Sequence, residues 1–352
     1  MRYRLCVWVA APVLVGAIAM AGSVTVIGQA APGGTPAAAA AAKASSVPRT
    51  PDGHPDLQGI WNYSTLTPLE RPKELGDKAV FTDEEAAAYE KSEVAARSAD
   101  RRDKTVRAVV NGTAETNDVA LAYNDFWWDR GTTIVGTKRT SLITEPSDGR
   151  LPALTAEAKR AAQERRQRIE RLAEGPEDRT TGDRCIHQQR TGPPMLPGGY
   201  NNHVQIFQTA GLVAMAVEQI HEFRIVPTDG RPHADGRIDL WKGDSRGRWE
   251  GDTLVVETMN FNGKMAFQGS TEKMRLVERF TRIDADSLLY EFRVEDPAAF
   301  TQPWSASLTM TKSEGPIFEY ACHEGNYAME GILRAARKIE KEGTSAPKKS
   351  SN

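Results

Sequence analysis

Residues 288–311 read LLYEFRVEDPAAFTQPWSASLTMT, and this stretch decides the fold class. Apolar side chains recur there at every second position. They are Leu288, Tyr290, Phe292 and Val294 in the first half, and Trp304, Ala306, Leu308 and Met310 in the second. A period of two is typical of strands with one buried face. The stretch therefore predicts two half-buried strands.

Strand signals continue on both sides of this stretch. We predict further strands at 204–209, 212–219, 222–227, 246–250, 253–260, 275–283 and 317–323, with shorter ones at 59–61 and within 132–146. Turn-rich links such as Glu250-Gly251-Asp252 are short, which favours neighbouring antiparallel strands. No predicted helix separates these strands, so a parallel α/β sheet is disfavoured. The fold class is mainly β with helical insertions, as an antiparallel barrel or meander with a C-terminal helix.

Three helices are predicted around these strands. Thr82 and Glu85 form a capping box before a helix that reaches about residue 99. Thr155 caps a second helix over 156–174, which completes a helical insertion at about 80–175. A final helix follows Asn326, and we expect its apolar face to dock on the sheet. That face comprises Met329, Ile332, Leu333, Ala336 and Ile339.

The N-terminal 30 residues have the features of a secretory signal peptide. Arg2 and Arg4 precede an apolar run, and small residues lie at the cleavage positions near Ala30. A retained membrane anchor is the alternative, because the run is nearly long enough to span a bilayer. We expect a disordered linker at 31–50, a single β-rich domain at 51–341 and a disordered tail at 342–352. After cleavage the protein would be periplasmic or secreted, with no membrane attachment.

Charge and cysteine content fit such a location. The formal net charge is −2, so nothing in the composition attracts nucleic acid. Cys185 and Cys322 remain after cleavage, in a compartment where disulfides persist. We expect them to pair, and two buried thiols are the alternative.

Two resemblances add to this interpretation. The motifs PDLQGIW, GDSRGRWEGDTLVVET and YACHEGNY, at 55–61, 243–258 and 320–327, resemble a family of uncharacterised secreted bacterial proteins with no established activity. Gly59 and Trp61 at the first strand, a meander and a closing helix are similar to lipocalin-like barrels. That resemblance implies that Trp61 plugs one barrel end and that the other end holds one small ligand.

Two loop segments are candidate ligand-binding sites. Trp127, Trp128, Asp129 and Arg130 combine aromatic planes with charges, which suits a ring-stacking platform, although large side chains can simply anchor an insertion. The second segment, 198–203, is polar and flexible. Its Tyr200, Asn201 and Asn202, with an imidazole beside them, could line a pocket mouth or only form turns.

Candidate catalytic residues lie further along the chain. Glu222 and Arg224 share one strand face and could orient a ligand, whereas His221, a candidate ligand contact, points to the opposite face. His233, in a loop, is the candidate general base. His323 or Glu324 is the candidate acid, and two further residues are candidate ligand contacts, Trp241 and Asp244.

No metal or organic cofactor is expected. The histidines lack the spacing that places two ligands on one face, and no phosphate loop or nucleotide fingerprint is present. The leading hypothesis is a secreted barrel that binds a sugar-like or aromatic small molecule and acts on it by acid–base chemistry as a hydrolase or lyase. A non-catalytic binding or transport protein and an envelope structural protein are the alternatives.

Overall fold

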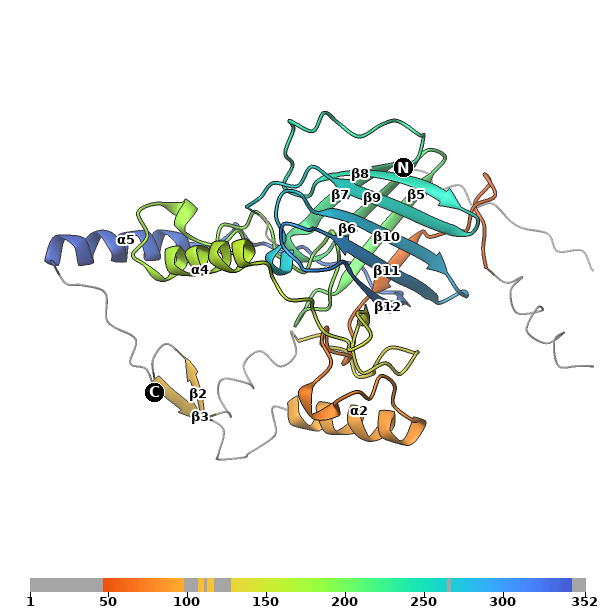
Figure 1. Ribbon diagram of the computed structural model, residues 1–352, viewed down its shortest axis with the longest axis horizontal. Coiled ribbons are helices and arrows are strands. Elements are labelled where there is room, and N and C mark those ends of the chain that lie inside the picture. The colour runs from red at the N-terminus through yellow and green to blue at the C-terminus, as the bar shows by residue number, and fades with distance from the viewer. Residues whose placement is uncertain (1–46, 98–106, 111–112, 117–127, 265–266, 344–352) are drawn as a thin grey trace, which may run out of the picture. The chain divides into compact units, whose positions relative to one another are not determined.

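The computed structural model describes residues 47–97, 107–110, 113–116, 128–264 and 267–343 (Figure 1). The predicted signal peptide, Trp127, and most of the predicted linker and tail lie outside these residues. Within the described part of the chain, none of the helices combines the length and apolar character needed to cross a bilayer.

A nearly closed antiparallel barrel dominates the structure, which confirms the predicted fold class (Figure 1). Its strand order is β7-β6-β5-β1-β12-β11-β10-β9-β8. The strands are β1 (Gly59–Asn62), β5 (His203–Thr209), β6 (Leu212–Val217), β7 (Glu222–Pro227), β8 (Asp244–Glu250), β9 (Thr253–Met259), β10 (Arg275–Arg282), β11 (Ser287–Glu295) and β12 (Trp304–Ser313). In addition β4 (Ile143–Glu145) pairs with β12, and β2 (Arg107–Val110) and β3 (Thr113–Thr116) form a separate hairpin.

The barrel interior is filled by the alternating side chains that the sequence predicts. Tyr290 and Trp304, on adjacent strands, are fully buried. Trp61 on β1 is also fully buried, and its indole Nε1 donates to the carbonyl of Leu57 at 2.9 Å. The register between β11 and β12 pairs Leu288 with Met310, so the two apolar sets face the same core.

β7 and β8 are the two end strands of the sheet and are not neighbours in its hydrogen-bonded order. Contacts that involve side chains hold them together. A Cβ added to Gly247 on β8 would lie 2.9 Å from a methyl of Val226 on β7, so the close approach requires glycine. Beside it, Arg224 of β7 donates from Nε to Ser245 of β8 at 2.9 Å. The barrel is closed at this seam by packing and one buried cation.

In the part of the chain that the structure describes, three α-helices accompany the barrel, α2 (Asp83–Arg97), α4 (Ala156–Glu170) and α5 (Tyr327–Glu342). Both predicted caps are confirmed. Thr82 N–H donates to the Glu85 carboxylate at 2.9 Å and Glu85 N–H to Thr82 Oγ1 at 3.2 Å. At α4, Thr155 Oγ1 accepts from Ala158 N–H at 3.1 Å.

The predicted strand at 317–323 is wrong, because these residues are irregular. β12 already pairs with β11 on one side and with β4 and β1 on the other, so it offers no free edge to the chain that leaves it. Phe318 N–H instead donates to the side chain of Glu218 at 2.9 Å. The segment lies against the barrel without joining the sheet.

The expected docking of the last helix on the sheet is not observed. In the described part of the chain, α5 is anchored by Arg337, which donates to the carbonyls of Ala173 at 2.8 Å and Glu174 at 2.9 Å, in the segment after α4. Asn326, before α5, donates to the carbonyl of Asp183 at 3.1 Å. Asn326 before α5 and Arg337 within α5 are both bonded to the segment 173–183. For this reason α5 is directed toward α4.

Candidate functional site

A groove of about 820 Å³ lies where β5 begins and β6 ends. We call it the outer groove, because the groove residue His203 alternates along β5 with Val204, which points into the core. Three segments far apart in the chain form its walls, at 128–129, 200–203 and 318–322. The lining residues are Trp128, Asp129, Tyr200, Asn201, His203, Glu218, Phe318, Glu319, Tyr320, Ala321 and Cys322.

A paired histidine and glutamate form one wall of the outer groove. The β5–β6 hairpin turns through two residues, so Val204 pairs with Val217 and the next residues outward, His203 and Glu218, lie side by side. His203 Nδ1 is 3.0 Å from Glu218 Oε2. Glu218 is 3% exposed, and its other oxygen accepts the Phe318 N–H at 2.9 Å. The carboxylate is therefore fixed in place and orients the imidazole.

Electrostatics reinforce this pair. The hydrogen bond to Glu218 raises the pKa of His203, against the opposing effect of partial burial. Burial alone would raise the pKa of Glu218, but hydrogen bonds from His203 and Phe318 outweigh it and lower that pKa. An imidazole held by a carboxylate can accept or donate a proton at a bound ligand.

Aromatic rings line the rest of the groove. Trp128 meets Tyr200 edge-on, with ring centroids 5.6 Å apart. Tyr200 and Tyr320 are stacked with centroids 6.3 Å apart and planes within 8°. Burial and the hydroxyl of Tyr200 raise the pKa of Tyr320 to about 12, so this phenol stays neutral at physiological pH. Phe318 is 69% exposed, so its ring is accessible at the groove.

A buried amide joins two walls of the outer groove. Asn202 is 1% exposed, and its side chain bonds both the backbone of Gly198 and the carbonyl of Asp129. Asp129 N–H donates to the carbonyl of Gly199 at 2.9 Å. A Cβ at Gly199 would lie 2.3 Å from the ring of Trp128, so glycine allows the indole to lie against the backbone. Asn202 thus supports the groove from behind.

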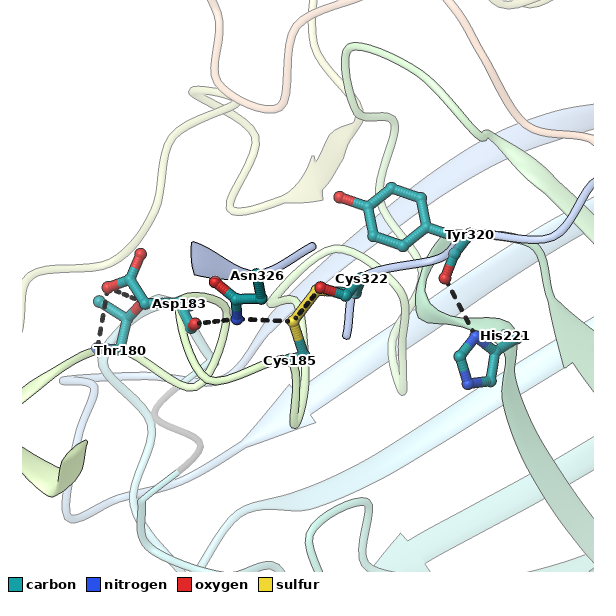
Figure 2. Close-up of a disulfide and its surroundings, with 7 residues drawn as sticks. All are labelled: Thr180, Asp183, Cys185, His221, Tyr320, Cys322 and Asn326. Atoms are coloured by element: carbon teal, nitrogen blue, oxygen red, sulfur yellow. Dashed lines mark hydrogen bonds between the residues drawn. A yellow bond between two sulfur atoms is a disulfide. The ribbon is translucent and has the colours of Figure 1, made fainter. Parts of the chain in front are cut away.

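The third wall is held by the predicted disulfide, which is confirmed between Cys185 and Cys322 (Figure 2). Figure 2 also shows His221 donating from Nδ1 to the carbonyl of Tyr320 at 3.2 Å. Tyr320 and Cys322 both line the outer groove. His221 and the disulfide therefore hold the segment that presents Phe318 and Tyr320.

The two predicted loop segments converge in this groove. Trp128, Asp129, Tyr200 and Asn201 line it together. Arg130 lies over the ring of Trp128 at 4.0 Å and lines a second cavity of about 620 Å³ that shares Trp128 with the groove.

Other predicted site residues lie elsewhere. His233 Nδ1 is 2.9 Å from the Asp244 carboxylate, which also pairs with Arg246 at 2.6 Å. Trp241 is partly buried before β8. His323 and Glu324 are exposed between Cys322 and α5. None of these residues lines the outer groove.

Glu222 and Arg224 share the inward face of β7 but do not pair with each other. Arg224 pairs with Glu278, whereas the carboxylate of Glu222 contacts Lys242 and accepts from Thr191 at 2.6 Å. His187 Nδ1 lies 3.3 Å from Glu222. Beside them a cavity of about 10 Å³ has room for a single water molecule. This cluster fastens the 187–195 loop to one end of the barrel.

Burial changes the titration of two members of this cluster. It lowers the pKa of His187 to about 2, helped by the charge of Lys242. It also lowers the pKa of Lys242 to about 7. Among the described residues, no three His, Cys, Asp or Glu side chains are grouped so that they could hold a metal ion.

No family model matches the chain, and no curated protein matches it. Among solved structures, the chain is similar to a secretary abundant heat soluble (SAHS) protein from Ramazzottius varieornatus. The similarity has 10% identity and a TM-score of 0.23, over 38% of this chain and 87% of that chain.

Proposed function

We propose that the protein binds a small molecule with an aromatic or sugar-like ring in the outer groove. One observation carries this proposal: rings from three distant segments, at 128, 200 and 318–320, meet in one groove beside the His203–Glu218 pair. A volume of about 820 Å³ is within the usual range for small-molecule sites. Stacked and edge-on rings offer flat surfaces for a ligand ring.

Several features support binding outside the cytoplasm. The Cys185–Cys322 disulfide fixes a wall of the groove, and disulfides persist mainly in exported proteins. The N-terminal sequence of residues 1–30 has the composition of a signal peptide. We propose that the mature protein works in the periplasm or outside the cell.

Binding is tested with the disulfide-bonded mature protein and a panel of aryl glycosides, aryl alcohols and aromatic amines, by ligand-observed NMR and calorimetry. Trp128→Phe should weaken binding about three- to tenfold, because one stacking surface shrinks. The matched control is Trp249→Phe, since Trp249 stacks on His54 instead, with centroids 4.4 Å apart. If no panel compound binds, or if both variants weaken binding equally, the proposal is wrong.

Acid–base turnover is a second candidate function, favoured by the His203–Glu218 geometry. In this function His203 takes a proton from a ligand hydroxyl, and Glu218 stabilises the resulting imidazolium. His203→Gln should abolish turnover of any panel compound while its binding persists. His233→Gln is the matched control, because His233 also pairs with a carboxylate but lies outside the groove. Turnover that survives in His203→Gln would exclude this role.

A further inference from the structure

The outer groove carries an excess of negative charge. Three carboxylates line it, from Asp129, Glu218 and Glu319, whereas no lysine or arginine is among the lining residues that the structure describes. Glu218 is paired with His203. The carboxylate of Asp129 accepts a hydrogen bond from the uncharged amide of Asn62 at 3.1 Å, and Glu319 is exposed. Even with His203 protonated, the described lining holds three carboxylates against one cation, so its charge remains negative.

The aromatic side chains add to the negative electrostatic potential of the outer groove. The faces of Trp, Tyr and Phe rings are electron-rich, and cations are attracted to them within about 6 Å of the centroid. Trp128, Tyr200, Phe318 and Tyr320 all belong to the groove lining. The guanidinium of Arg130 lies over Trp128 and lines the neighbouring cavity. Rings and carboxylates in one groove are the combination that recognises ammonium groups with apolar substituents.

We infer that the ligand of the outer groove is an organic cation, a quaternary ammonium or a protonated amine with apolar or aromatic substituents. The inference rests on the proposed binding function and names its ligand class. Asp129 and Glu319 supply the opposite charge, and the rings contact the apolar substituents. An anionic ligand would meet three carboxylates that are offset by a single imidazole, with no lysine or arginine in the described lining.

The test uses a matched pair of probes, choline and its neutral isostere 3,3-dimethylbutan-1-ol, with the mature disulfide-bonded protein at low ionic strength. Choline should bind at least about tenfold more tightly, because only the cation gains from the rings and carboxylates. Its affinity should fall as salt is added, since exposed charges are screened. Equal affinity for both probes would overturn the inference.

Two variants test whether the charge of Glu319 contributes to the tighter binding of choline. Glu319→Gln should weaken choline binding about three- to tenfold and leave the neutral isostere unchanged. Glu319 is exposed, so this change does not endanger folding. Glu314→Gln is the matched control, because Glu314 is exposed in the same segment but does not line the groove. Equal choline affinity in both variants would overturn the inference.

The outcomes separate this inference from the proposed function. Binding of neutral glycosides or aryl alcohols that depends on Trp128, without binding of any cation, overturns the ligand class and leaves the groove as a binding site. Failure of every panel compound and of both matched probes overturns the inference and the proposed function together.

Discussion

Arg224 on β7 and Glu278 on β10 form an ion pair across the barrel interior, with Arg224 Nη1 donating to Glu278 Oε1 at 3.0 Å and Nη2 contacting the second carboxylate oxygen. The neighbours satisfy the remaining groups. Thr258 accepts from the guanidinium at 2.8 Å, and Tyr290, whose pKa burial raises, donates to Glu278 at 2.7 Å. Because Glu278 is fully buried, the pair ties the β7 edge across the β7–β8 seam to β10.

Removing one partner should be costly. Arg224→Met leaves the Glu278 carboxylate buried without its cation, so we expect a loss of about 3–5 kcal/mol in the free energy of unfolding. Urea denaturation measures it. Arg248→Met is the control, since its partner Glu250 lies on the exposed face and such pairs contribute at most about 1 kcal/mol. Equal losses would contradict the role of the buried pair. In the double variant Arg224→Met/Glu278→Leu, part of the loss should be recovered.

Loss of the disulfide should affect stability and binding together. In Cys185→Ser/Cys322→Ser, a constraint across 137 residues is removed, so the free energy of unfolding should fall by about 2–5 kcal/mol. Ligand affinity should also fall, because Cys322 ends the wall that carries Phe318 and Tyr320. Calorimetry at a temperature where the variant is folded measures the second effect. Unchanged affinity would show that the wall is held without the disulfide.

Stability should depend on pH through His187. Its pKa is about 2 when folded and near 6.5 when unfolded, so the unfolded chain binds the proton first as pH falls. The stability contribution is complete above about pH 6.5 and is lost toward pH 2, at up to about 1.4 kcal/mol per pH unit. Urea titrations between pH 7 and 4.5 should show a shallower decline for His187→Asn than for the wild type. Parallel declines would exclude the effect.

Gly199 should be sensitive to even one added methyl group. In Gly199→Ala the new Cβ would overlap the ring of Trp128, so the indole must move. We expect a loss of about 1–3 kcal/mol in stability, a changed Trp fluorescence spectrum and weaker ligand binding. Gly136→Ala, where no atom lies within 4 Å of the added Cβ, should match the wild type. An unchanged spectrum in Gly199→Ala would contradict the packing of Trp128.

Much of the fold could be predicted because its signals are local. The alternation in 288–294 and 304–310 reports which face of each strand is buried, and the caps at Thr82 and Thr155 use side chains within one turn. The prediction failed at 317–323, where strand-like composition met no free sheet edge. Whether 317–323 can join the sheet depends on the strands that already pair with β12. Two of them, β1 and β4, lie far away in the chain.

The candidate site was predicted in part. Trp128, Asp129, Tyr200 and Asn201 were proposed as ligand contacts, and the structure brings them together. The pairing of His203 with Glu218 is absent from the sequence-based predictions. The two-residue turn between 209 and 212 would predict it, because the register of this hairpin places residue 203 beside residue 218. No local sequence pattern predicts that Lys242 and His187 contact Glu222, because these contacts form only when the barrel closes.

Strand faces and helix caps follow from residues close together in the chain. The pairing of Cys185 with Cys322 was expected from the sequence, with two buried thiols as the alternative, and the folded chain brings the two sulfurs together. Contacts between distant segments bring 128–129, 200–203 and 318–322 into one groove, and they pair Arg224 with Glu278 rather than with Glu222. The two kinds of feature differ in how far apart along the chain the residues lie that produce them. Side-chain direction follows from the backbone of a few neighbours, whereas these meetings depend on β1 pairing between β5 and β12 and on closure of β7 against β8.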